Sequence, residues 1–279
     1  LVNLAFRIVQ WDRVKAWKFR RVYFACVLVL SALVVTGGII NFNTIRISGY
    51  KISCAARSSE IKKLRIAFVS DFHLEKSVPA GFVWRFVKKI NDVNPDILLY
   101  GGDVLEGRGE NIQDYEKLLG SIRPEFGMFG VRGNHDRIGE ENDNFFSRAG
   151  IILLRDSVAV IDHAFSIAGR EEAGNHSRMS AQEIAAEAPD SLPLIVIDHR
   201  PTEPDQISST HADIAFSGHT HDGQLFPLNF YLRKVYQLSH GYMRKGNTHF
   251  FVSSGIRLWG PRVRTAGKSE IMVIDVDFH

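Results

Sequence analysis

Five short apolar runs in this sequence each lead directly into Asp, Asn or His. Short apolar runs bounded by polar or glycine-containing joints are typical of buried strands. In open α/β sheets, ligands bind at the edge formed by the carboxyl ends of the strands. The sequence therefore predicts one ligand site assembled by five strands. The runs are 66–69, 97–100, 128–131, 194–197 and 214–216, and they lead into Asp71-Phe72-His73, Gly102-Asp103, Asn134-His135-Asp136, Asp198-His199 and His219-Thr220-His221.

The first 40 residues divide into a basic stretch and an uncharged apolar stretch. Residues 1–21 hold six basic residues and one acid, so the rest of the chain carries −2 of the net +3. Residues 22–40 carry no charge, and as a helix they would be about 28 Å long, close to the roughly 30 Å hydrocarbon core. By the positive-inside rule we expect a basic cytoplasmic tail at 1–21, then a transmembrane anchor or uncleaved signal at 22–40. The alternatives are a disordered tail and an export signal that is removed.

The remaining chain is expected to form a linker with an edge strand at 41–63 and a catalytic domain at 64–279. Apolar residues at helical spacing within 82–93 and 112–122, closed by Pro95 and Pro124, predict two helices. Ser180-x-x-Glu183 is a capping box that predicts a helix through Ala188. Further strands are expected at 151–154, 158–162, 165–168, 249–253 and 271–276. Because the basic excess lies in the amino-terminal stretch, we expect no nucleic-acid partner.

The side chains at the strand ends supply oxygen and nitrogen ligands without a thiolate, a set that suits manganese, iron, cobalt or zinc. Seven ligands exceed the four of one tetrahedral site, but they suit two cations that share a bridging carboxylate. Two cations roughly 3.5–4 Å apart can hold both the attacking and the leaving oxygen of a phosphoryl displacement, with the hydroxide between them as nucleophile. The seven candidates are Asp71, His73, Asp103, Asn134, His199, His219 and His221.

The order of these motifs resembles that of the calcineurin-like metallophosphoesterases over roughly residues 64–276. The flanks Gly223-Gln224 and Ser254-Gly255-Ile256 resemble the branch of bacterial phosphodiesterases that are exported or anchored in the membrane. The resemblance implies a four-layer αββα sandwich, here preceded by one transmembrane helix. The motifs that carry it are Asp71-x-His73, Gly102-Asp103, Gly133-Asn134-His135-Asp136, His199 and Gly218-His219-Thr220-His221.

The resemblance also implies a role for each of these residues. It implies two divalent ions, for which we expect manganese first, with iron, zinc, cobalt or nickel as alternatives. His135 would contact the phosphate and protonate the leaving oxygen, and Asp136 would orient His135. Asp103 would bridge the two ions. The other ligands would be Asp71, His73 and His221 for one ion, and Asn134, His199 and His219 for the second.

Several polar residues near the motifs have open roles. Asp222 stands where this branch usually has glycine, and we expect a solvated loop acid there. The alternatives are weaker binding of an anionic substrate and binding of a basic group. Arg170 is expected either to contact phosphate or to lie on the surface. Asp198 is either a support for His199 or a strand-end acid. His240 could line the pocket, whereas His249 is expected in a surface or loop position.

Together these observations favour a dinuclear metal-dependent phosphoesterase acting on a phosphodiester, a pyrophosphate or a phosphomonoester. We expect a monomer that crosses the cell membrane once and carries its catalytic domain outside the cytoplasm. The alternative is a metal-binding scaffold of the same fold without turnover. Residues 226–236 are aromatic and apolar with two adjacent cations, so a lipid-linked substrate is a further expectation. Burial of these aromatic residues in the core is the competing interpretation.

Overall fold

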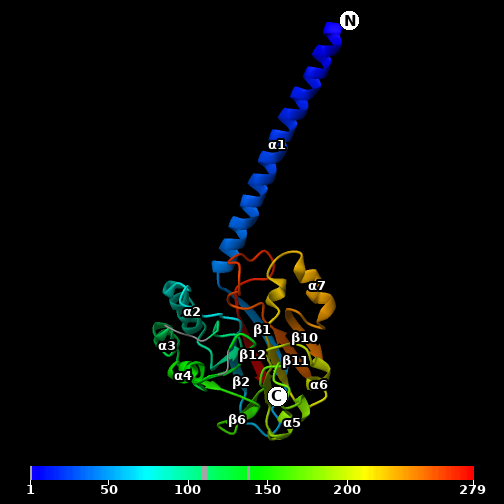
Figure 1. Cartoon of the computed structure of the whole chain (residues 1–279). Helices are drawn as coiled ribbons and strands as arrows, with labels where there is room; N and C mark the ends of the chain where they lie inside the picture. The colour runs from blue at the N-terminus through cyan, green and yellow to red at the C-terminus, as the bar shows by residue number, and fades with distance from the viewer. Residues whose placement is uncertain (1, 108–111, 137–138) are drawn as a thin grey trace.

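The structure is a computed structural model, and it describes residues 2–107, 112–136 and 139–279. Figure 1 shows one long helix that projects from a domain built of two sheets and flanking helices. The helices are α1 (Val2–Asn43), α2 (Ala80–Val93), α3 (Gln113–Leu119), α4 (Glu140–Arg148), α5 (Ala181–Ala186), α6 (Pro204–Ser208), the 3-10 turn η1 (His221–Gly223) and α7 (Leu228–Val235). The strands are β1 (Arg46–Cys54), β2 (Lys63–Val69), β3 (Ile97–Gly101), β4 (Met128–Val131), β5 (Ile151–Leu153), β6 (Ser157–Ile161), β7 (Phe165–Gly169), β8 (Leu194–Ile197), β9 (Ile214–Ser217), β10 (Gly241–Lys245), β11 (Thr248–Val252) and β12 (Glu270–Phe278).

The helix α1 joins the basic and the apolar stretches into one continuous element. Its segment Lys15–Asn43 is long and apolar enough to cross a membrane. Apolar side chains such as Val22, Leu30 and Leu33 are exposed along it. The sequence-based boundary at residue 21 therefore separates two compositions and does not mark an end of the helix.

The domain contains two six-stranded sheets. The strand order is β1-β12-β2-β3-β4-β5 in the first sheet and β10-β11-β9-β8-β7-β6 in the second. Strand β1 lies at an edge, where it pairs in parallel with β12, so the edge strand predicted within 41–63 is present. Pairing is parallel from β2 through β3 to β4 and from β7 through β8 to β9. Parallel pairing sends the carboxyl ends of all five predicted site strands to one edge of their sheets.

Three apolar clusters separate four layers. The innermost cluster lies between the sheets, where the rings of Phe68 and Phe216 stack with their centroids 4.7 Å apart. A second cluster packs α2, α3 and α4 on the first sheet, and includes Phe86 edge-on to Phe72 at 4.9 Å. A third packs α5 and α6 on the second sheet through Ile184. The predicted αββα sandwich is therefore confirmed.

The local signals in the sequence locate most elements but miss some of their ends. Helix α2 ends where Asn94 adopts a left-handed conformation just before Pro95, because the residue before proline avoids the helical region. The capping box at Ser180 is present, although α5 ends at Ala186. Helix α3 is shorter than the predicted 112–122. The helices α4 and α6 and the strand β10 were not predicted.

Candidate metal centre

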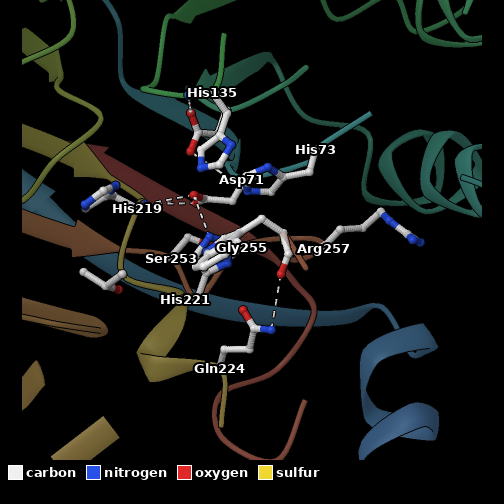
Figure 2. Close-up of polar contacts among 12 residues, drawn as sticks. Asp71, His73, His135, His219, His221, Gln224, Ser253, Gly255 and Arg257 are labelled. Carbon is white, nitrogen blue, oxygen red and sulfur yellow. Dashed lines mark hydrogen bonds and ion pairs between the residues drawn. The ribbon is translucent and has the colours of Figure 1, made fainter. Parts of the chain in front are cut away.

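The turns after β2 and β9 bring the first group of predicted ligands together. The ligand atoms of Asp71, His73 and His221 all lie within 4.8 Å of one another, and all three residues are buried. His221 Nε2 is 3.4 Å from Asp71 Oδ1, and the rings of His73 and His221 are 5.3 Å apart. Figure 2 shows these imidazoles, with that of His219, gathered around the Asp71 carboxylate.

The turns after β3 and β8 contribute most of the second group. Ligand atoms of Asp103, His199 and His219 also lie within 4.8 Å of one another. His199 Nε2 is 3.2 Å from Asp103 Oδ2. The predicted amide ligand joins this group, because Asn134 Oδ1 lies 3.3 Å from the same His199 nitrogen.

The carboxylate of Asp103 lies between the two groups. Its Oδ2 is 4.0 Å from His73 Nε2 in the first group and 3.2 Å from His199 Nε2 in the second. Its Oδ1 accepts a hydrogen bond of 2.7 Å from the His135 backbone amide, which fixes its orientation. One carboxylate thus faces a histidine of each group, as a bridging ligand must.

Most of these residues have a backbone conformation that L-amino acids rarely adopt. Positive φ values for non-glycine residues carry a steric cost and cluster at functional sites. In this centre they turn each side chain back into the pocket directly after its strand. The residues concerned are Asp71 (φ 54°), His73 (48°), Asp103 (52°), His219 (69°) and His221 (52°).

Two motif glycines allow the turns to approach each other closely. A Cβ at Gly133 would overlap Asp103 Oδ1, and a Cβ at Gly218 would overlap Ser70 and Asp71 Oδ2. Any larger residue at either position would therefore displace a carboxylate of the centre.

The pKa of one histidine of the centre, His199, is raised, and the pKa of two others, His219 and His221, is lowered. Burial lowers the pKa of His199, but the adjacent Asp103 carboxylate outweighs it and raises that pKa to about 10. Burial and the nearby His199 cation lower the pKa of His219 to about 4. Burial and His73 hold the pKa of His221 well below its ordinary value. Burial would raise the pKa of Asp103, yet His199 keeps it below the usual range.

The donor set fits divalent cations. The buried His73 Nε2 and His221 Nδ1 have no hydrogen-bond partner among the described residues, and buried polar atoms are normally paired. His199 Nδ1 lies 2.8 Å from the Gly101 carbonyl oxygen. That contact orients the ring so that Nε2 faces the pocket, as a supporting contact does for a metal-binding histidine. Imidazole and carboxylate without thiolate suit manganese, iron or zinc.

Glu106 belongs to the centre although it lies outside the predicted motifs. Its Oε2 is 2.7 Å from His73 Nδ1 and its Oε1 is 2.9 Å from His135 Nδ1. The hydrogen bond with His73 is the main cause that lowers the pKa of Glu106. One carboxylate therefore orients a predicted metal ligand and the predicted general acid together. Its position three residues after Asp103, in the same strand-end turn, is the signal that could have identified it.

The structure gives Asp136 a different role from the predicted one. Its carboxylate accepts backbone N–H bonds from Val104 (3.3 Å), Leu105 (2.7 Å) and Gly133 (2.9 Å). It therefore ties the turn after β3 to the turn after β4, and the contact that orients His135 comes from Glu106. Burial, with a contribution from Asp103, raises the pKa of Asp136 to about 6.

The expected solvated position of Asp222 and both expectations for Arg170 were wrong. Asp222 is buried and has φ 47°, a conformation that favours glycine, and its Oδ2 is 4.0 Å from His240 Nδ1. It is therefore not a solvated loop acid. Arg170 neither lies on the surface nor faces the centre, because its buried Nη1 is 2.6 Å from both Asp198 and Glu203.

The other polar candidates lie in structural networks. Asp198 pairs with arginines rather than with His199. His240 Nε2 contacts Glu270 Oε1 at 2.8 Å. His249, expected in a surface or loop position, is buried, and its Nδ1 lies 3.0 Å from the Tyr242 hydroxyl. His249 belongs to β11, which lies between β10 and β9 in the sheet, and this position explains its burial.

A four-layer αββα fold with Asp, Asn and His side chains at one edge of the sheets defines a metallophosphoesterase. The model of the family described as calcineurin-like phosphoesterase matches residues 64–223, and the chain belongs to this family. That match contains the candidate ligands from Asp71 to His221.

The chain is similar to several named relatives. It is 29% identical over 224 residues to an uncharacterized metallophosphoesterase of Campylobacter jejuni, covering 77% of this chain and 59% of the relative. It is 25% identical over 280 residues to a transmembrane protein with metallophosphoesterase domain of Danio rerio, covering 93% and 63%. Identity to an uncharacterized metallophosphoesterase of Bacillus subtilis is 30% over 229 residues, covering 75% and 82%. The chain thus spans about three fifths of the first two relatives.

Proposed function

We propose that this protein is a phosphoester hydrolase that uses two divalent cations, with manganese as the first expectation. The observation that supports this most strongly is the Asp103 carboxylate, which faces His73 of one ligand group and His199 of the other. When bound, two such cations supply Lewis acidity and an activated water for an in-line displacement at phosphorus. Asp71 and His221 would complete the first site, and Asn134 and His219 the second.

His135 is the residue we propose as the general acid. Its Nδ1 is held by Glu106 at 2.9 Å, so Nε2 is the nitrogen that can reach a leaving oxygen. Its ring lies 4.8 Å from that of His73, which places it beside the first ligand group. A histidine next to the reacting phosphate can deliver a proton to the departing alkoxide, which is otherwise a poor leaving group.

The location we propose is the cell membrane, with α1 as a single span and the domain outside the cytoplasm. The apolar exposed surface of α1 supports a span, and some relatives are named transmembrane proteins. The basic residues before residue 22 favour a cytoplasmic amino terminus. Protease added to intact spheroplasts should therefore digest the domain. Protection that is lost only after lysis would contradict this orientation.

The substrate we propose is a phosphodiester or pyrophosphate carried by a lipid, with soluble phosphoesters as the rival class. Trp259, more than half exposed, lies with its ring 6.2 Å from that of His135. An exposed aromatic side chain therefore borders the site where the leaving group would depart. This arrangement suits a substrate with an apolar portion next to its phosphate.

Turnover of an aryl phosphodiester by the full-length protein in detergent tests the proposed reaction. After treatment with a chelator, activity should be lost, and added manganese should restore it. A His163→Ala variant controls for the loss of a histidine outside the centre, because His163 is exposed and lies apart from the ligands. This variant should remain active. A protein that binds the metal but hydrolyses no diester, monoester or pyrophosphate would be the scaffold of the alternative hypothesis.

A further inference from the structure

The end of α1 is fixed to the domain by the loop that precedes β12. The Arg264 amide donates to the Gly38 carbonyl at 3.1 Å. Asn41 Nδ2 donates to the carbonyls of Arg264 at 3.0 Å and Gly267 at 3.1 Å. The Ser269 hydroxyl donates to the Phe42 carbonyl at 2.8 Å. Since α1 passes into the domain without a free linker, its direction sets where a bilayer lies relative to the domain.

The same loop also holds the segment that leads into α7. The amide of Thr265 donates to the Gln224 carbonyl at 3.0 Å, and the Phe226 amide donates to Thr265 Oγ1 at 2.9 Å. Gln224 Nε2 donates to the Trp259 carbonyl at 3.3 Å. Figure 1 shows α7 at the end of the domain where α1 enters, with the carboxyl terminus at the far end.

The apolar part of α1 reaches the level of this loop. Ile39 and Ile40 are 44% and 60% exposed, and they belong to the same helical turn as Gly38 and Asn41, which the loop contacts. The headgroup region adds roughly 5–8 Å to each side of the hydrocarbon core. If Ile39 and Ile40 are to reach lipid, the loop and its neighbours must lie within this headgroup region.

The surface next to α1 at this level is apolar and aromatic. Each of the eight residues of α7, all within the described part of the chain, is at least partly exposed. Tyr231 is 65% and Trp259 is 54% exposed. Arg233 and Lys234 add positive charge in the last turn of the helix. We name this surface the α7 rim, and define it by Phe226, Leu228, Phe230, Tyr231, Val235 and Trp259.

We propose that the α7 rim is a second membrane contact, inserted at the boundary of headgroups and acyl chains in the leaflet from which α1 emerges. Amphipathic helices with aromatic and basic residues bind at this depth, and Trp and Tyr prefer it. The cations of α7 are placed for anionic headgroups. The inference rests on α1 crossing the bilayer and is independent of the reaction that the centre catalyses.

The same loop connects the proposed membrane contact to the metal centre. Backbone amides of Ile256 and Arg257 donate to the carbonyls of Ser70 and Asp71 at 2.9 and 3.0 Å, so the loop that clamps α1 also packs on the turn of the first ligand group. Gln224, which precedes the rim, follows the ligand His221 by three residues. Short stretches of chain therefore join the proposed membrane contact to the first ligand group.

Site-specific fluorescence on the full-length protein in liposomes of phosphatidylglycerol and phosphatidylcholine tests this contact. In a Cys26→Ser background, a polarity-sensitive label would be placed on Tyr231→Cys and, as the control, on Val160→Cys. Val160 is an exposed apolar residue, 44% exposed, on β6, a strand at the end of the domain away from α1 (Figure 1). The remaining Cys54 is buried. Metal content equal to that of the parent protein would show that each labelled variant is folded.

The label at position 231 should be blue-shifted and quenched severalfold more by nitroxide-labelled lipid than the label at 160. Iodide in the water should quench it severalfold less. Equal behaviour at the two positions would overturn the proposal. So would a label at 231 that is protected from both quenchers, because the rim would then be covered by a second copy of the chain. Release of the protein by alkaline carbonate would remove the premise that α1 spans the bilayer, and would overturn the proposal for that separate reason.

Discussion

Folded domains usually bury apolar side chains and expose charged ones, and the metal centre and the α7 rim each break one half of this rule. The centre buries the charged side chains of Asp71, Asp103 and His199, whereas the rim exposes apolar side chains such as Tyr231. Burying charges costs free energy unless they are paired, and the centre pairs them with one another or with metal. Exposed apolar patches on a folded domain usually mark a binding surface. Each region therefore supports one of the two proposals, bound ions in the first case and a lipid surface in the second.

The loop between Ser254 and Ser269 connects these two regions through a buried arginine. Arg264 Nη1 donates to the carbonyls of Ser254 and Lys268, and its Nη2 donates to that of Arg257, each at 2.7 Å. Burial lowers the pKa of Arg264 to about 10, which leaves it charged at neutral pH. The loop is thus held from inside, so the fold sets how the rim is placed relative to the centre.

Changing His135 should give the largest effect on catalysis while leaving the ion sites intact. His135→Ala should lower kcat about 10²–10⁴-fold, the usual contribution of a general acid. The loss should be smaller for nitrophenol, an acidic leaving group that needs no proton. Steady-state kinetics on substrates of graded leaving-group pKa, together with metal analysis, would measure this. Equal losses on all substrates would show that His135 only positions the phosphate.

Glu270 should stabilise the connecting loop in a manner that depends on pH. Burial would raise its pKa, but His240 and the bonds from Ser254 and Ser48 lower it to about 2. A depressed carboxyl pKa stabilises the fold above the unfolded value of 4.5, and this stability is lost as pH falls from 4.5 towards 2. Glu270→Gln should therefore lower the free energy of unfolding at neutral pH by roughly 3 kcal/mol.

Unfolding of the full chain in detergent, followed across this pH range, would measure the difference between Glu270→Gln and the native protein. The difference should shrink towards zero as the pH approaches 2. Asp277→Asn, an exposed carboxyl on the same strand, is the control and should have little effect. A difference that is independent of pH would show that Glu270 acts by packing alone.

Glu106 should matter through both histidines that it orients. Glu106→Gln keeps the shape of the side chain but removes its charge, and loss of such a supporting carboxylate costs about 10–100-fold in metal affinity or activity. Manganese titration and the pH profile of kcat should both change. Glu75→Gln, an exposed glutamate of the preceding turn, should change neither. An unaltered pH profile with weaker manganese binding would restrict the role of Glu106 to His73.

Changes in the rim should give the smallest effect, limited to substrates in a membrane. The double change Phe230→Ser and Tyr231→Ser should lower turnover of a lipid-linked phosphodiester relative to a soluble one. Val160→Ser, which removes an exposed apolar side chain from β6 at the other end of the domain (Figure 1), should leave this ratio unchanged. Equal effects of the double change on both substrates would contradict a role for the rim in reaching lipid.

The centre could be predicted from sequence because strand ends fix where ligands meet, whatever the rest of the domain does. The role of Glu106 was not predicted because its partners His73 and His135 come from different turns. Only the fold brings both histidines to one carboxylate. The left-handed backbone conformation of Asp222 could not be predicted either, because a single acidic residue in a sequence does not indicate that conformation. The sequence of residues 226–236 is compatible both with a buried core element and with an exposed surface, because exposure depends on how the whole domain packs.

The central claim is that one carboxylate joins two ion sites, and metal stoichiometry tests it most directly. Native protein equilibrated with excess manganese and freed of unbound ions should contain two manganese ions per chain by elemental analysis. Asp103→Ala should lose both ions, because it removes the shared ligand and leaves two cations repelling at short range. One ion or fewer in the native protein, or one ion fully retained by Asp103→Ala, would contradict the claim.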